Sequence, residues 1–467
     1  MHRLLPFLLL ATPAVAQDSP PIDDPRIHEI VAAVSAEQLD TDVRTLVSFG
    51  TRSTLSDTLS DTRGIGAARR WIKREFDRIG EACGGCLEVF YLEEVFPPGR
   101  GFPDSTNVVN VVAIQRGTTD PNRMVIMSGD IDSRITDRLN AVDSSPGAND
   151  NASGMAGTIA AARVLTRYRF SGSIVYLGLS GEEQGLYGGR TVARIARERS
   201  WNIEAVLNND MIGNIEGVNG VIDNTTARVF SDGNPPISFS LPQLDEAGRD
   251  TLAWALRRVL GTLRRRRVAG SDVDGVSRQI ARYVDRIADR YVTNLDVIMI
   301  YRLDRFGRGG HHTPFADVGY PAVRIMETNE NYTRQHQDIR VENGIAYGDV
   351  IAGVDFDYAR KLTGLNVAVL ASLSWAPSPP QNVRIGGIVQ ADARLAWEPP
   401  ADTSNLAGYR VYWRRTDSPT WDFSRWVGET TEHTFHGLVI DNYYFGVAAV
   451  ARDGNESPVA FPGRTMR

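Results

Sequence analysis

The sequence predicts an α/β protein with a mostly parallel sheet and helices on both faces, followed by an all-β sandwich. Three observations carry this prediction. Apolar segments of strand length alternate with helical segments between residues 87 and 208, which is typical of a parallel sheet covered on both faces. A Pro-rich segment, 376–380, then interrupts the chain. Beyond it, short alternating segments follow one another at the spacing of a β-sandwich.

Length and composition fit a soluble protein with more than one domain. The chain has 467 residues, which exceeds one ordinary hydrophobic core. Its hydrophobic content of 42% and charged content of 23% are typical of globular proteins. A net charge of -6 argues against a nucleic-acid partner, because binding to phosphates needs a basic surface.

Residues 1–16 predict a signal peptide. His2 and Arg3 precede an apolar run, and Ala14 to Ala16 have the small-x-small pattern of a cleavage site. The run is too short to span a bilayer, and no later segment reaches the roughly 20 apolar residues of a transmembrane helix. We therefore expect an exported protein, periplasmic or extracellular, without an integral membrane segment.

The first domain is predicted over 30–375. Apolar residues at helical spacing predict helices over 30–46 and 65–79. The strands expected after them cover 87–95, 106–115, 124–127, 173–179, 204–208, 297–300 and 322–325. The other helices are expected over 153–167, 185–198, 246–268, 276–290 and within 347–374. The arginine run 264–267 is interpreted as a solvated helix end rather than as a polyanion site.

Cys83 and Cys86 are the two cysteines of the chain. A CxxC pair can form a redox centre or half of a zinc site. Because no second CxxC is present and export is expected, we predict a small structural disulfide between them.

Acidic residues follow three of the predicted buried strands. They lie in the segments SGDIDS (128–133), SGEEQG (180–185) and NNDMIG (208–213). A fourth acidic segment, PGANDNASG (146–154), precedes a helix. The carboxyl ends of parallel strands meet at one edge of a sheet, where ligands collect. Carboxylates gathered there are costly without a positive charge among them, so we expect a metal ion.

Late histidines extend this set. GGHHTPF (309–315) and NYTRQHQ (331–337) contribute three of the seven histidines of the chain. Mixed oxygen and nitrogen ligands favour zinc, cobalt or manganese over calcium or magnesium.

These motifs, in this order, resemble those of the M28 family of zinc aminopeptidases, over about residues 40–375. The resemblance implies a zinc exopeptidase-like α/β fold, a peptide or protein substrate, and two divalent metal ions, with zinc expected. Asp150 would bridge the two metals, with Glu183 and His336 completing one site. Asp130 and Asp210 would complete the other. Glu182 would be the general base.

The resemblance also implies a supporting role for Asp132, and it leaves two departures. The family has histidine where this chain has Asp130, which makes that site more anionic and can alter the metal preference. The family's last histidine follows its tyrosine directly, whereas three residues separate Tyr332 from His336. We choose His336 as the last metal ligand over His312, which resembles a family histidine that lines the substrate pocket.

Other functions remain open at this point. One alternative is a non-catalytic binding protein that retains the fold, although Glu182 and the three metal ligands Glu183, Asp150 and Asp210 are all present. Another is a carboxypeptidase or a relative of glutaminyl cyclases. The residues do not reveal the preferred substrate residue.

Residues 380–465 resemble a fibronectin type III domain. Trp397 lies on an early predicted strand, and Leu438 precedes Tyr443 and Tyr444 near a late one. The segment carries no cluster of acid–base or metal-binding residues. We therefore expect a spacer or an accessory that contacts a surface or polymer.

Overall fold

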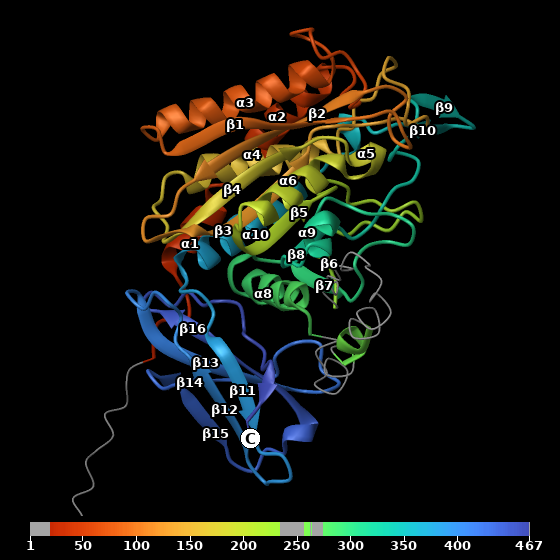
Figure 1. The fold of residues 1–467 in the computed structure, drawn as a ribbon. Helices are drawn as coiled ribbons and strands as arrows, with labels where there is room; N and C mark the ends of the chain where they lie inside the picture. Colours follow the sequence, from red (N-terminus) through yellow and green to blue (C-terminus); the bar gives the residue numbers. More distant parts are fainter. Residues whose placement is uncertain (1–18, 234–255, 262, 264–273, 467) are drawn as a thin grey trace, which may run out of the picture.

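The computed structural model describes residues 19–233, 256–261, 263 and 274–466. The predicted signal peptide over 1–16 and the arginine run 264–267 lie outside these residues. Of the helix predicted over 246–268, only 256–261 and 263 are described, and these are helical. The predicted architecture is confirmed: an eight-stranded sheet carries helices on both faces, and an all-β domain follows it (Figure 1).

The central sheet is mixed, with a parallel centre. Its strands are β1 (Leu87–Phe96), β2 (Thr106–Gln115), β3 (Asp120–Asp130), β4 (Gly172–Leu179), β5 (Asn202–Asn209), β6 (Thr226–Ser231), β7 (Asp296–Ile300) and β8 (Ala322–Glu327). Their order across the sheet is β1-β2-β4-β3-β5-β8-β6-β7. The contiguous strands β4, β3, β5 and β8 pair in parallel, as do β6 and β7. The remaining pairs are antiparallel.

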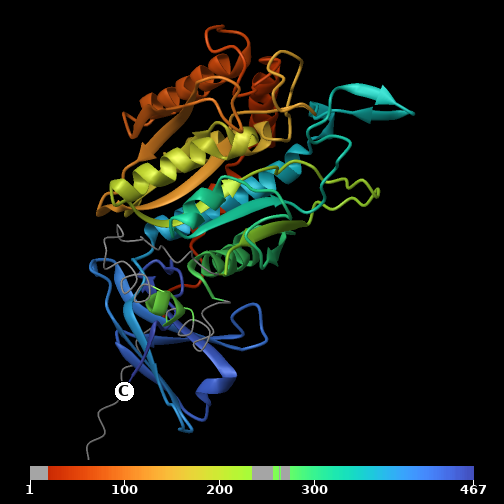
Figure 2. The same cartoon turned by 45° about the vertical axis from the view of Figure 1, so that its right-hand side comes forward.

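Two apolar cores cover the two faces of this sheet. One face packs against α1 (Pro25–Ala32), α2 (Ala36–Ser48), α3 (Gly64–Ala82), α4 (Ala152–Leu165), α8 (Val276–Tyr291) and α10 (Phe356–Trp375). The other face packs against α6 (Tyr187–Glu198) and α9 (His312–Asp317). A short helix, α5 (Glu182–Gly185), follows β4, and the hairpin of β9 (Arg340–Glu342) and β10 (Ile345–Tyr347) projects from the domain (Figure 2). Among the described helices, none combines the length and hydrophobicity needed to cross a bilayer.

Several elements differ from the sequence prediction, and α9 and the hairpin of β9 and β10 are among those not predicted. The single helix predicted over 30–46 is wrong, because the chain forms α1 and α2 with a break between them. The hydroxyl of Ser35 accepts the backbone N–H of Gln38 and caps α2, a signal that apolar spacing alone hides. Strand β6 was not predicted: it is short, and Arg228 interrupts its apolar pattern.

The C-terminal domain is a sandwich of two sheets with its own core. One sheet contains β11 (Gln381–Gly386), β12 (Ala393–Glu398), β15 (Glu432–Phe435) and β17 (Arg464–Thr465). The other contains β13 (Leu406–Arg415), β14 (Phe423–Gly428) and β16 (Tyr443–Ala451). Trp397 is buried between them and meets Tyr409 edge to face at 5.3 Å between ring centroids. The predicted β-sandwich is therefore confirmed.

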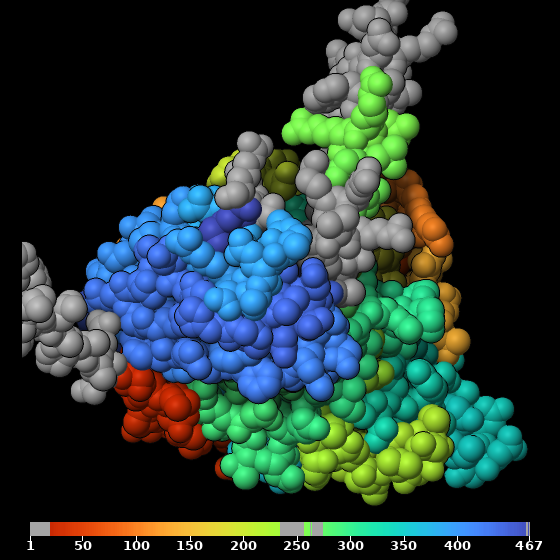
Figure 3. Space-filling view, turned by 90° about the horizontal axis from the view of Figure 1, so that it is seen from below, coloured from red at the N-terminus to blue at the C-terminus, as the bar shows by residue number. Residues whose placement is uncertain are grey.

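The two domains meet through buried ion pairs. The carboxylate of Asp274 is completely buried and accepts hydrogen bonds from Arg282 on α8 and Arg414 on β13, each at 2.5 Å. In the view from below, the C-terminal domain covers much of this end of the molecule and borders the N-terminal residues (Figure 3). Asp24 and Arg26 belong to this border, because Asp24 accepts from Asn455 and Arg26 pairs with Asp453. The sandwich is thus packed against the first domain rather than suspended from a linker.

Candidate metal centre

The parallel centre of the sheet brings the predicted acidic residues to one edge. Asp130, at the end of β3, is aligned with Leu179 at the end of β4, and its neighbour Gly129 is aligned with Asn209 at the end of β5. The chain segments that follow these three strands carry Asp132, Glu182, Glu183 and Asp210. The alignment of the strands is therefore what gathers these carboxylates.

Close packing of glycines brings the turn with Asp150 to the same edge. A Cβ on Gly129 would lie 2.5 Å from backbone atoms of Gly154 and Met155, and a Cβ on Gly154 would lie 2.2 Å from the carbonyl oxygen of Asn209. Helix α4 can therefore approach β3 and β5 this closely only without side chains at both positions. Asn151 caps this helix by accepting the backbone N–H of Gly154.

Two buried side chains hold the turn itself. The carboxylate of Asp349 accepts the backbone N–H of Asn149 at 2.9 Å and that of Asp150 at 2.7 Å. The guanidinium of Arg52 donates to the carbonyl oxygens of Ile131, Pro146 and Gly147. These contacts satisfy backbone groups that would otherwise be buried without partners, and they fix the direction of the Asp150 side chain.

Asp150, Glu183 and His336 form a compact cluster. Nε2 of His336 lies 2.9 Å from Oδ2 of Asp150 and 3.2 Å from Oε1 of Glu183. Among the residues that the structure describes, this is the one group of three or more His, Cys, Asp or Glu side chains whose ligand atoms lie within 4.8 Å of one another. The backbone of His336 is in the left-handed region, with φ 57°, which is uncommon for a residue other than glycine and concentrates at functional sites.

This cluster fits a divalent metal. Two carboxylate oxygens and one imidazole nitrogen are ligands that zinc accepts, and three protein ligands leave a position open, as in catalytic zinc sites. The side chains of Asp150 and Glu183 are only 10% and 5% exposed, so two carboxylates share a nearly dry site. Arg134 offsets part of this charge at Oε2 of Glu183, and a cation among the three ligand atoms would offset more of it. The structure therefore brings together three of the five predicted metal ligands.

Glu182 lies beside the cluster at the start of α5. Burial raises the pKa of its carboxyl well above the ordinary range, and the neighbouring charges of Glu183 and Asp210 raise it further. A higher pKa makes the carboxylate form of this side chain a stronger base. Glu182 is thus a titratable group next in the chain to Glu183, one of the predicted metal ligands.

Asp132 supports the loop that carries these glutamates. Its carboxylate accepts the backbone N–H groups of Glu182 and Glu183, each at 3.2 Å, and the hydroxyl of Thr54 at 3.0 Å. The Thr54 hydroxyl in turn accepts the backbone N–H of Gly181. Asp132 therefore acts on the cluster through the backbone of the loop.

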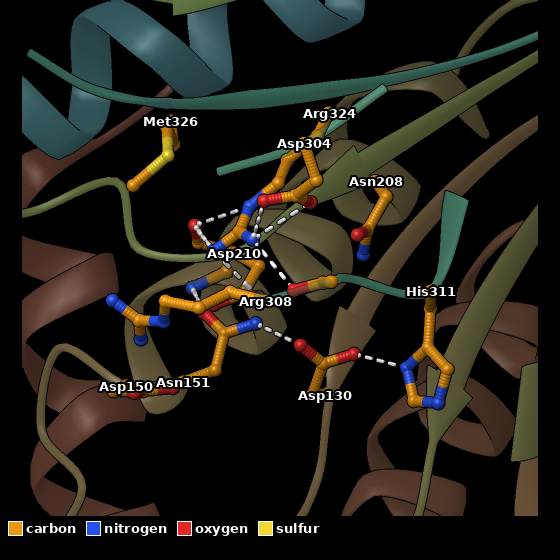
Figure 4. A network of polar contacts seen from close by, with 12 residues as sticks. Asp130, Asp150, Asn151, Asn208, Asp210, Asp304, Arg308, His311, Arg324 and Met326 are labelled. Carbon is orange, nitrogen blue, oxygen red and sulfur yellow. Dashed lines mark hydrogen bonds and ion pairs between the residues drawn. The ribbon is translucent and has the colours of Figure 1, made fainter. Parts of the chain in front are cut away.

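Asp130 and Asp210, the other two predicted metal ligands, have protein partners. Oδ1 of Asp130 lies 2.5 Å from Nδ1 of His311, and its Oδ2 accepts from the side-chain amide of Asn151 at 2.7 Å. Oδ2 of Asp210 lies 2.9 Å from Nη2 of Arg324. Figure 4 shows Asp130 between Asn151 and His311, and Arg324 between Asp210 and Asp304. The structure does not bring Asp130 and Asp210 into the compact cluster.

His312, the predicted substrate-binding residue, is not part of the cluster. Its side chain is completely buried, and its Nε2 donates to the carbonyl oxygen of Leu303 at 2.7 Å. His336 is the histidine that meets Asp150 and Glu183, while the role of His312 stays a prediction.

Cys83 and Cys86 are joined by a disulfide at the end of α3.

Sequence reasoning missed several side chains of the site. Arg134 holds two predicted ligands, because its Nε lies 2.9 Å from Oε2 of Glu183 and its Nη2 lies 2.6 Å from Nδ1 of His336. Its position two residues after Asp132 could have suggested it. Arg324 could have been found as the one charged residue within the apolar stretch AVRIM of β8. No pattern in the sequence points to Asp349, which follows the hairpin of β9 and β10.

Comparisons with known proteins identify the family and the fold. Residues 110–231 match the model of peptidase family M28, and residues 378–462 match that of the fibronectin type III domain. The chain is similar to a "probable zinc metalloprotease" of Pyrenophora teres f. teres, with 39% identity over 94% of this chain and 87% of that one. A relative with a similar name from Leptosphaeria maculans is 40% identical over 95% of this chain and 98% of its own length.

Among solved structures, the LapA aminopeptidase of Legionella pneumophila has a similar fold. It superposes with a TM-score of 0.51 at 18% identity, over 78% of each chain. At this identity the likeness concerns the fold alone. The fungal relatives, by contrast, are similar to this chain over nearly its whole length. With the two domain matches, this similarity establishes that the chain belongs to peptidase family M28 and carries a C-terminal fibronectin type III domain.

Proposed function

We propose that this protein is an exported, metal-dependent exopeptidase, and specifically an aminopeptidase that uses Glu182 as its general base. The observation that carries the proposal is the cluster of Asp150, Glu183 and His336 with Glu182 directly beside it in the chain. The names of the fungal relatives support zinc as the metal. The aminopeptidase fold of LapA is similar to this one, but it supports the fold rather than the specificity.

The residues of the site suit hydrolysis of a peptide bond. A divalent metal bound to the cluster would act as a Lewis acid that polarises the scissile carbonyl and makes water more acidic. Glu182 would accept a proton from the attacking water as its oxygen bonds to the carbonyl carbon. It would then pass that proton to the nitrogen of the leaving amine as the carbon–nitrogen bond breaks. Asp132 would keep Glu182 in place through its contacts with the loop backbone.

A second metal, held by Asp130 and Asp210 and bridged by Asp150, is part of the prediction from the family resemblance. The partners that Asp130 and Asp210 have in this chain do not support it. Measuring the number of metal ions bound per chain would test the second site independently of catalytic activity.

Export is proposed from residues 1–16 and from the disulfide. The disulfide between Cys83 and Cys86 supports an oxidising compartment, because such bonds are rare in the cytosol. Periplasmic and extracellular locations both satisfy this condition. The contact of the C-terminal domain with a surface or polymer likewise stays a proposal.

A panel of blocked peptides tests the reaction. An aminopeptidase is expected to release residues from peptides with a free amino end and an amidated carboxyl end, and to spare N-acetylated peptides. Cleavage of the acetylated peptides with a free carboxyl end would show a carboxypeptidase instead. Conversion of an N-terminal glutamine into pyroglutamate without hydrolysis would show a cyclase. Zinc binding without turnover of any peptide would favour a non-catalytic binding protein.

A further inference from the structure

The strongest unexplained feature of the site is a buried arginine beside a predicted metal ligand. The side chain of Arg324 on β8 is completely buried. Its register opposite Asn208 on β5 puts it next to the segment that carries Asp210. A guanidinium is always charged in proteins, so Arg324 brings a permanent positive charge to this edge of the sheet.

Arg324 is held on every side. Its Nη1 donates to both carboxylate oxygens of Asp304, at 3.2 and 3.1 Å, and to the carbonyl oxygen of Gly309 at 2.8 Å. Its Nη2 donates to the carbonyl oxygen of Asp210 at 3.0 Å and lies 2.9 Å from Oδ2 of the same residue. A side chain with so many buried partners cannot move aside to admit a second cation without leaving them unpaired.

The side chain of Asp130 is also hydrogen-bonded within the protein. Both of its carboxylate oxygens have buried protein partners, Nδ1 of His311 and the amide of Asn151. Asn151 has a second partner in the carbonyl oxygen of Asn209, at 2.7 Å, and it caps α4. A metal on Asp130 would therefore compete with contacts that also fix the start of α4.

We propose that this chain builds a one-metal centre, in which Asp150, Glu183 and His336 hold the metal and the guanidinium of Arg324 takes the place of a second cation beside Asp210. The proposal rests on the proposed function, because it concerns the same site. In it, Arg324 is a positioning residue that keeps Asp210 in place and offsets the acidic charge at the sheet edge. Asp130 serves as a hydrogen-bonded support of the Asn151 cap rather than as a ligand.

The metal content of the purified protein tests this proposal. After the protein is stripped with a chelator, reconstituted with excess zinc and freed of unbound ions, we expect one zinc per chain by elemental analysis. His336→Ala is expected to retain none, whereas Asp210→Asn is expected to retain one with unchanged affinity. Two zinc ions in the wild-type chain, or the loss of one in Asp210→Asn, would overturn the proposal.

Two further measurements test the number of bound metals without relying on activity. Reconstitution with manganese is expected to give the electron paramagnetic resonance spectrum of isolated ions, and a spin-coupled pair would contradict a one-metal centre. Asp130→His introduces the histidine of the family pattern but keeps Arg324, so it is expected to bind one metal still. A second metal in this variant would show that Asp130, not Arg324, limits the count. These readouts use no substrate, so failure to cleave peptides would overturn the proposed function and leave the metal count intact.

Discussion

The carboxylate of Asp349 accepts the backbone N–H of Asp150 at 2.7 Å and thereby aims the Asp150 side chain at His336. These residues are far apart in the chain, and Asp349 has no place in the motifs that identify the family. It nevertheless constrains the geometry of a proposed metal ligand, because its two carboxylate oxygens accept backbone N–H groups of the turn.

Asp349→Ala should therefore weaken metal binding. Removal of a group that orients a ligand lowers metal affinity by about 10–100-fold in known sites, and we expect a loss of that size here. Competition with a chromophoric chelator measures it. Asp357→Ala, at an 82% exposed position on α10, is the matched control and should bind metal as the wild type does. Equal affinities in both variants would show that the turn does not need Asp349.

Gly154→Ala should destabilise the protein and disturb the site together. A Cβ at this position would lie 2.2 Å from the carbonyl oxygen of Asn209, and backbone cannot yield as a flexible side chain can. Overpacking of this kind costs about 1–3 kcal/mol, which chemical denaturation would reveal. Gly463→Ala, whose added Cβ would meet no atom within 4 Å, should leave stability unchanged. A neutral Gly154→Ala would mean that α4 can withdraw from the sheet edge.

Asp274→Ala should loosen the packing of the C-terminal domain. The substitution leaves Arg282 and Arg414 buried without their shared carboxylate, and breaking a buried pair in this way costs about 3–5 kcal/mol. Calorimetry is expected to show a lower melting temperature, with a separate transition for the sandwich. Asp417→Ala removes a 79% exposed partner of Arg415 and should change little, since surface pairs contribute about 0–1 kcal/mol. Similar melting curves for both variants would argue against a buried ionic interface.

Acid should weaken the same interface through Glu456. Burial raises the pKa of this carboxyl, but Arg286 and Arg410 and a hydrogen bond from Tyr412 outweigh burial and lower it below the ordinary range. Because the folded-state pKa lies below the unfolded value of about 4.3, the stabilisation is complete above that pH and is lost as the pH falls below it. Melting temperatures between pH 6 and pH 3 should thus fall less steeply for Glu456→Gln than for the wild type. Parallel curves would remove Glu456 from this role.

Much of the fold followed from the sequence because burial leaves a clear pattern. The continuous apolar segments of β3, β4 and β5 predicted a parallel centre, and the carboxylates after them predicted a shared edge. Helices α1 and α2 were merged because the cap at Ser35 lies within an unbroken apolar spacing. Strand β6 was missed because its six residues include Arg228.

The site was predicted in part for a similar reason. Asp150, Glu182 and Glu183 lie within dense motifs, and the choice of His336 over His312 agrees with the position of His336 in the cluster. The contacts of Arg324 and Asp349 are set by strand register and by loop packing, which no local motif encodes. The partners of Asp130 and Asp210 therefore could not be predicted before the strand register was known.

The central claim is that Glu182 transfers the proton while the cluster beside it holds the metal, and Glu182→Gln tests it most directly. Glutamine keeps the shape of the side chain but cannot accept the proton. We expect metal content equal to that of the wild type, with kcat on an amidated peptide reduced by about 10²–10⁴-fold. Full turnover by Glu182→Gln with its metal bound would contradict the account.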